Sequence, residues 1–175
     1  MHDAEHVYRS RWFEDIPVGE FHVFGNHTFG EKEIIDFGLA YDPQPMHTDI
    51  DAARTDLHFG LVASGWHICA IWMRLMVTYM ERYATGVRDG RRNGAGIGFQ
   101  NMRWLKPVRP GHNLTYTYEI IEKPDKVIKE KWGIIRSRNE AYNQYGELVF
   151  SFEIDILAER RPATEVAKFK ANDSQ

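Results

Sequence analysis

Residues 65–83 constrain the fold of this 175-residue chain more than any other segment. The segment reads as one long helix that begins at Gly65 and is apolar on nearly every side. Within it, His67, Arg74 and Thr78 form only a narrow polar stripe. A helix of this kind must be buried on most sides, so other parts of the chain have to wrap around it. We therefore expect its Met and Trp residues to belong to the core and Arg74 to be a buried structural residue.

The segments that can wrap this helix read as strands and lie mostly downstream of it. One strand is predicted at residues 21–28, before the helix. Four more are predicted after it, at residues 97–106, 114–120, 127–138 and 148–157. The sequence Asn143-Gln144-Tyr145-Gly146 between the last two is typical of a hairpin turn. This inventory predicts an α+β fold, an antiparallel sheet packed against one long helix.

Residues 41–47, Tyr-Asp-Pro-Gln-Pro-Met-His, place a carboxylate and an imidazole five positions apart with two prolines between them. Each proline fixes its own φ and favours extended geometry in the residue before it, which excludes a helix interior and predicts a stiff connector. Acid–base chemistry needs such stiffness, because a general base works only within about 2.6–3.2 Å of its proton. The segment therefore predicts Asp42 and His47 as a catalytic pair. The alternative is a plain turn in which Asp42 caps its own backbone.

The same segment, continued through residues 59–65 (Phe-Gly-Leu-Val-Ala-Ser-Gly), resembles the signature of the MaoC-like dehydratases, the family of the (R)-specific enoyl-CoA hydratases. Asp42, Pro45 and His47 match the family pattern Gly-Asp-x-Asn-Pro-aliphatic-His, whereas Tyr41 replaces its Gly and Gln44 its Asn. The resemblance covers roughly residues 12–157. It implies the hotdog fold, in which a sheet wraps around a central helix, and an acyl site at a subunit interface.

The resemblance further implies a lyase that reversibly hydrates a trans-2-enoyl-CoA to a 3-hydroxyacyl-CoA. Asp42 and His47 would both contact the catalytic water, and which of them is the base stays open. The backbone N–H of Gly65 is the expected donor to the thioester oxygen, because a helix N-terminus offers unpaired donors and a positive dipole end. Two alternatives are a hotdog acyl-CoA thioesterase and a non-catalytic acyl-binding or regulatory subunit.

The expected substrate-binding residues are Gln44, Ser64, Lys106 and Arg109. The last two could meet the phosphates of coenzyme A. Ser64 lacks the Gly-x-Ser-x-Gly context of a nucleophile and reads as a helix cap. We expect neither a metal nor another cofactor, since the eight histidines are scattered and no nucleotide-binding fingerprint follows a strand.

Composition narrows the remaining function classes. A net charge of −3 argues against a nucleic-acid surface, and the longest apolar run, residues 68–73, is too short to cross a bilayer. One cysteine, Cys69, excludes a disulfide framework and fits a cytoplasmic protein. We expect residues 1–162 to form a single domain and residues 163–175 a loose tail. An open sheet edge predicts a homodimer or higher homo-oligomer.

Overall fold

The computed structural model describes residues 12–55, 60–84, 93–125, 127–129 and 131–162. The expected tail, residues 163–175, lies outside these ranges. The helical elements are η2 (Phe13–Asp15), α1 (Glu31–Tyr41), α2 (Pro45–Thr48), α3 (Ile50–Ala53) and α4 (Gly65–Ala84). The strands are β1 (Phe21–Thr28), β2 (Asn93–Trp104), β3 (Asn113–Glu122), β4 (Val127–Ile128), β5 (Trp132–Tyr142) and β6 (Leu148–Glu159).

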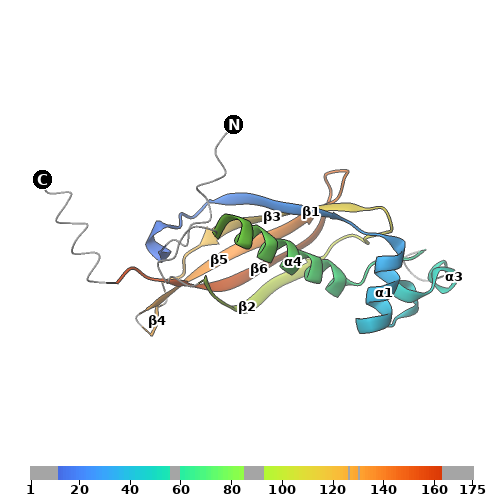
Figure 1. Ribbon diagram of the computed structural model, residues 1–175, viewed down its shortest axis with the longest axis horizontal. Helices are drawn as coiled ribbons and strands as arrows, with labels where there is room; N and C mark the ends of the chain where they lie inside the picture. Colours follow the sequence, from blue (N-terminus) through green and yellow to red (C-terminus); the bar gives the residue numbers. More distant parts are fainter. Residues whose placement is uncertain (1–11, 56–59, 85–92, 126, 130, 163–175) are drawn as a thin grey trace, which may run out of the picture.

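The strands form one antiparallel sheet in the order β1-β3-β5-β6-β2, and β4 pairs with β5 off this path. Helix α4 lies across one face of the sheet, and α1 and α3 lie near one end of it (Figure 1). This is the hotdog arrangement of a sheet around a central helix, so the predicted α+β fold class is confirmed.

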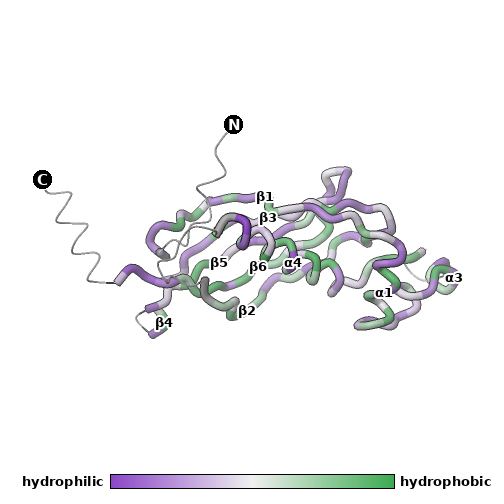
Figure 2. The backbone as a smooth tube through the Cα atoms, in the orientation of Figure 1, coloured by the Kyte–Doolittle hydropathy of each residue, from purple (hydrophilic) through white to green (hydrophobic). Residues whose placement is uncertain are grey.

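The core lies between α4 and the face of the sheet that it covers. Hydrophobic and hydrophilic residues alternate along much of the strands, as expected for a sheet with one buried face (Figure 2). From the helix, Ile68, Ile71 and Trp72 pack into this core. The buried strand residues opposite them include Leu114, Tyr116, Ile135, Phe150, Phe152 and Ile154.

The opposite face of α4 is not covered by the residues that the structure describes, contrary to the expectation that the helix is buried on most sides. Trp66, Met73 and Val77 are exposed large apolar side chains, and Arg74 is exposed as well. One sheet can cover only one side of a helix, which explains the difference. The prediction of a buried, structural Arg74 was therefore wrong for the single chain.

Two local predictions also need correction. Pro45 begins a one-turn helix, α2, instead of continuing a non-helical connector. Proline fits the first helical position because its missing N–H has no partner there in any case. The predicted strand 127–138 is two antiparallel strands, β4 and β5, because the chain turns at Lys129, whose φ is 51°.

A buried polar contact fixes α4 against β5. The indole N–H of Trp72 donates to the Asn139 side-chain oxygen (3.1 Å), and the Asn139 amide donates to the hydroxyl of Ser137 (3.0 Å). Asn139 is fully buried. An unpaired buried polar group lowers the free energy of unfolding by more than one hydrogen bond contributes. Removal of either Trp72 or Asn139 therefore leaves the other with an unfavourable unpaired group.

We therefore expect Trp72→Phe to lower the free energy of unfolding by about 2–4 kcal/mol, from the smaller ring and the unpaired Asn139 oxygen. Denaturant unfolding measures the change, and Trp66→Phe, at an exposed position of the same helix, is the control. The double variant Trp72→Phe/Asn139→Leu should lose less than the sum of the single losses. Strict additivity would show that the hydrogen bond does not couple the two elements.

Candidate active site

Asp42 is placed by the end of α1. Its backbone N–H donates to the carbonyl of Gly38 (2.9 Å), which closes the last turn of the helix before Pro43. The following helix, α2, packs tightly against this turn. A Cβ atom built on Gly38 would lie 2.7 Å from the backbone oxygen of His47 and 3.0 Å from its Cβ. Glycine at this position therefore lets α1 and α2 approach closely enough to bring Asp42 and His47 together.

His47 lies in α2 and is 4% exposed. Its Nδ1 atom is 2.8 Å from the carbonyl oxygen of Val62, and its Nε2 atom is 3.3 Å from Oδ2 of Asp42. A carbonyl can only accept a hydrogen bond, so we assign the ring proton to Nδ1. In the neutral imidazole, Nε2 then carries the free lone pair and faces the carboxylate.

The Asp42 carboxylate accepts two further hydrogen bonds. The hydroxyl of Ser64 donates to Oδ2 (2.7 Å), and the Gln44 side-chain amide donates to Oδ1 (2.8 Å). Partial burial alone would raise the pKa of Asp42. The hydrogen bonds from Ser64 and Gln44 and the nearby His47 outweigh it, and the net pKa lies below the usual value. Asp42 is thus a carboxylate with two bound donors and an imidazole beside it.

Gly65 is the first residue of α4, next to this pair. The Ser64 hydroxyl accepts from the backbone N–H of Trp66 (3.2 Å), so Ser64 caps the helix. Among the described residues, no hydrogen bond is donated by the backbone N–H of Gly65. The indole of Trp104 lies against Gly65 and donates to its carbonyl (3.1 Å). A Cβ on Gly65 would lie 2.7 Å from that indole, so glycine is required here for close packing.

Asp42, His47 and Gly65 share one cavity of about 360 Å³. Its apolar lining comes from α2, from the N-terminus of α4 with the residues before it, and from the end of β2 with the segment after it. The apolar members include Met46, Val62, Trp66, Ile68, Trp104, Leu105 and Val108. A larger hollow of about 770 Å³ between α1 and α4 contains none of the three predicted catalytic residues. The smaller cavity therefore holds the three predicted catalytic residues together with an apolar wall.

The four predicted substrate-binding residues fall in different places. Gln44 and Lys106 line the cavity, and Lys106 forms an ion pair with Glu147. Ser64 is 1% exposed and directs its hydroxyl to Asp42. Arg109 is not among the lining residues. The structure thus brings Gln44 and Lys106 to the cavity and places Ser64 behind the carboxylate.

Sequence reasoning missed three groups that shape this site. The carbonyl of Val62 fixes the orientation of His47, and a backbone carbonyl leaves no side-chain signal. Trp104 packs on Gly65 from the end of a strand 39 residues away. Gly38 was the one detectable signal, because a glycine in the interior of a helix such as α1 often has a packing reason.

Within the described ranges, no group of three or more histidine, cysteine or acidic side chains is arranged to hold a metal ion. None of the helices in the same part of the chain is both long and apolar enough to span a membrane.

Comparisons with known proteins identify the family. The sequence model of the MaoC like domain matches residues 14–141. The uncharacterized protein YdeM of Bacillus subtilis (strain 168) is 27% identical over 147 residues, which are 84% of this chain and 98% of that protein. The crystal structure of a MaoC-like dehydratase from Rhodospirillum rubrum is 32% identical with a TM-score of 0.73, and the match covers 87% of this chain and 99% of that one.

The X-ray structure of a monoamine oxidase regulatory protein from Archaeoglobus fulgidus is also similar. It is 26% identical with a TM-score of 0.74, and the match covers 88% of this chain and 99% of that one. The family match extends over more than half of the chain and includes the segment that carries Asp42, His47 and Gly65. The chain therefore belongs to the MaoC-like domain family.

Proposed function

We propose that this protein is an acyl-thioester hydro-lyase that reversibly hydrates a trans-2-enoyl-CoA to a 3-hydroxyacyl-CoA. The observation that carries the proposal is the convergence of Asp42 and His47, 3.3 Å apart, in a cavity that also contains the N-terminus of α4 at Gly65. The family membership and the MaoC-like dehydratase from R. rubrum support the same reaction class.

The tautomer of His47 suggests how the pair handles water. With Nδ1–H bound to Val62, the Nε2 lone pair and the Asp42 carboxylate are two acceptors side by side. A water molecule between them would donate one hydrogen to each and point its oxygen lone pairs into the cavity. Asp42, with its lowered pKa, stays ionised, so His47 Nε2 is the group that takes the proton from water as its oxygen attacks the β-carbon.

Attack at the β-carbon breaks the carbon–carbon π bond and moves its electrons toward the thioester oxygen. We assign the stabilisation of the resulting enolate to the N–H of Gly65, because it lies at the positive end of the α4 dipole. The protonated His47, held by Asp42, then returns its proton to the α-carbon. One water is consumed, the thioester stays intact and both residues return to their starting states.

Two observations bear on the remaining site residues. Ser64 and Gln44 each donate to Asp42, so we assign them the role of orienting its carboxylate. Lys106 is a cationic side chain that lines the cavity and pairs with Glu147, and we propose that it meets the coenzyme A moiety.

The alternative functions predict different products. A hotdog thioesterase would release free coenzyme A, and its chemistry would not require His47 as a partner of Asp42. A non-catalytic acyl-binding subunit would leave the substrate unchanged, and the regulatory name of the A. fulgidus relative favours keeping this alternative.

Incubation of the purified protein with trans-2-enoyl-CoA thioesters of increasing chain length separates the three functions. Loss of the enoyl ultraviolet absorbance without release of free thiol is the result expected for the lyase. Free thiol at a rate equal to acyl-CoA loss would identify a thioesterase. Saturable binding without any turnover along the series would identify a binding subunit.

We also propose a homodimer. The β2 edge of the sheet presents Ile97 and Phe99, which are 48% and 55% exposed, and the uncovered face of α4 presents Met73 and Val77. Exposed apolar patches and unpaired strand edges are commonly covered by a partner. The free thiol of Cys69 is consistent with the cytoplasmic setting proposed for this dimer.

Light scattering at micromolar concentration is expected to give about twice the 20.4 kDa mass of one chain. Ile97→Lys places a charge on the proposed interface and should shift the protein toward the monomer. Leu39→Lys, at an exposed position on α1, is the matched control and should leave the mass unchanged. A 20.4 kDa particle for the parent protein would contradict the dimer.

A further inference from the structure

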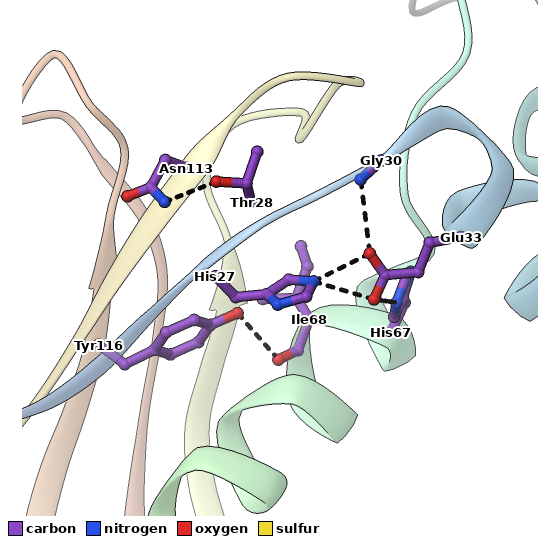
Figure 3. A network of polar contacts seen from close by, with 8 residues as sticks. All are labelled: His27, Thr28, Gly30, Glu33, His67, Ile68, Asn113 and Tyr116. Atoms are coloured by element: carbon purple, nitrogen blue, oxygen red, sulfur yellow. Dashed lines mark hydrogen bonds and ion pairs between the residues drawn. The ribbon is translucent and has the colours of Figure 1, made fainter.

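A second polar cluster lies away from the cavity that holds Asp42 and joins three elements of the fold. Glu33 on α1 accepts hydrogen bonds from the Nε2 atom of His27 on β1, 2.9 Å from each carboxylate oxygen. The Nε2 atom of His67 on α4 lies 3.3 Å from the same carboxylate. Figure 3 shows the Glu33 carboxylate between the two imidazoles and the backbone N–H of Gly30.

Aromatic rings hold both imidazoles in fixed orientations. The His67 ring stacks on Phe37 with centroids 4.5 Å apart and planes 5° from parallel. The fully buried Phe29 makes edge contacts with the rings of both His27 and His67, each at 5.0 Å. Since Glu33 and Phe37 are one turn apart on α1, that helix contacts His67 from two successive turns.

Two helices, α4 and α1, connect the cluster to the proposed active site. Along α4, the backbone N–H of His67 donates to the carbonyl of Ser64 (3.0 Å), whose hydroxyl binds Asp42. Along α1, the helix that carries Glu33 ends at Tyr41, and its C-cap residue is Asp42. The contact between Asp42 and Ser64 therefore depends on the position of α1 relative to α4. Glu33 on α1 is the charged side chain that binds His67 on α4.

Apolar packing alone does not explain why polar side chains occupy this cluster. His67 is 3% exposed, and its Nδ1 atom has no hydrogen-bond partner among the described residues. Burial lowers the pKa of His67 despite the nearby Glu33, which acts to raise it. Buried polar groups that contribute little to stability are retained in some proteins because they fix one geometry. A contact that fixes the position of α1 relative to α4 would have such a role.

We propose that Glu33 is a positioning residue for the hydration reaction: by binding His27 and His67 together, it sets α1 against α4 and thereby holds Asp42 in register with Ser64 and His47. The inference rests on the proposed function. Glu33 is not among the residues that line the cavity of about 360 Å³ with Asp42 and His47, and it borders the larger hollow of about 770 Å³ instead. Its assigned role is therefore to act through α1, without contact with the catalytic water or the thioester.

Glu33→Gln keeps the size of the side chain and removes its charge, and Glu31→Gln is the matched control on the exposed side of the same turn. We expect Glu33→Gln to lower kcat on a trans-2-enoyl-CoA about ten-fold with little change in KM, because a small misplacement of catalytic groups slows the chemical step. The control should match the parent. Unchanged kcat in a folded Glu33→Gln protein, or a loss confined to melting temperature and KM, would overturn the proposal.

The NMR resonances of the His47 ring give a readout that needs no turnover. We expect them to shift in Glu33→Gln and not in Glu31→Gln, although neither glutamate contacts His47. If the parent hydrates no enoyl thioester, the proposed function fails, while an unshifted His47 resonance would separately overturn the positioning role. If Glu33→Gln does not fold, His67→Phe is the second variant, because it keeps a ring between Phe29 and Phe37. It should show the same loss of kcat and the same shift of the His47 resonances. Parental values of both would overturn the proposal.

Discussion

Replacing Asp42 with asparagine is expected to lower kcat on a trans-2-enoyl-CoA by about 10²–10⁴-fold. Asparagine keeps the shape of the side chain and can still accept from Ser64, but it removes the negative charge that accompanies His47 through the reaction. His47→Gln removes the titratable ring and should cause a similar loss. The double variant should be little slower than either single variant, because residues that act as a unit are non-additive.

Asp36→Asn is the matched control, because it removes an exposed carboxylate from the same helix. Its kcat should equal that of the parent, and the melting temperature of Asp42→Asn should stay close to the parental value. If Asp42→Asn unfolds the protein, the carboxylate is mainly a structural group of the turn. If both site variants fold and hydrate at the parental rate, an acyl-binding role becomes the better account.

The second large effect is expected from Gly38→Ala, at a position that touches no substrate. The new methyl group would meet the backbone oxygen of His47 at 2.7 Å and Cγ2 of Thr48 at 2.9 Å, so α2 has to move. Displacement of His47 by a fraction of an ångström to one ångström should lower kcat by up to about 10²-fold. The melting temperature should fall only slightly, because alanine is favoured over glycine within a helix by up to about 1 kcal/mol, which offsets part of the clash.

Gly30→Ala is the control for this change. It adds the same methyl group at the N-cap of the same helix, where nothing lies within 4 Å, and should leave kcat unchanged. Steady-state kinetics and thermal unfolding of both variants make the comparison. A Gly38→Ala protein with parental kcat would show that the close approach of α1 and α2 is not needed for the chemistry.

The parts of the fold that could be predicted from sequence are those with a strong local period. The predicted helix 65–83 corresponds to α4, and the alternating segment 148–157 to β6. The exposed face of α4 could not be predicted, because an apolar pattern does not tell burial by the same chain from burial by a partner. Pro45 was misread for a related reason, since proline is compatible with both a non-helical connector and the first position of a helix.

The site was partly predictable because its two reactive side chains lie close together in the sequence. The spacing of Asp42 and His47 indicated an acid–base pair, and the structure places them 3.3 Å apart. The groups that hold them come from distant positions. Ser64 is 22 residues from Asp42, and Val62 binds His47 through a carbonyl that every residue has. Such contacts follow from tertiary packing and have no local pattern to reveal them.

The central claim, that the Asp42–His47 pair adds water across an enoyl double bond, is tested most directly by mass spectrometry of the product formed in heavy water. We expect an intact 3-hydroxyacyl-CoA that carries one deuterium at the α-carbon. The parent and Asp36→Asn should form it, whereas its formation by Asp42→Asn should fall to background. Free coenzyme A with the corresponding acid, or the same labelled product formed at the parental rate by Asp42→Asn, would contradict the claim.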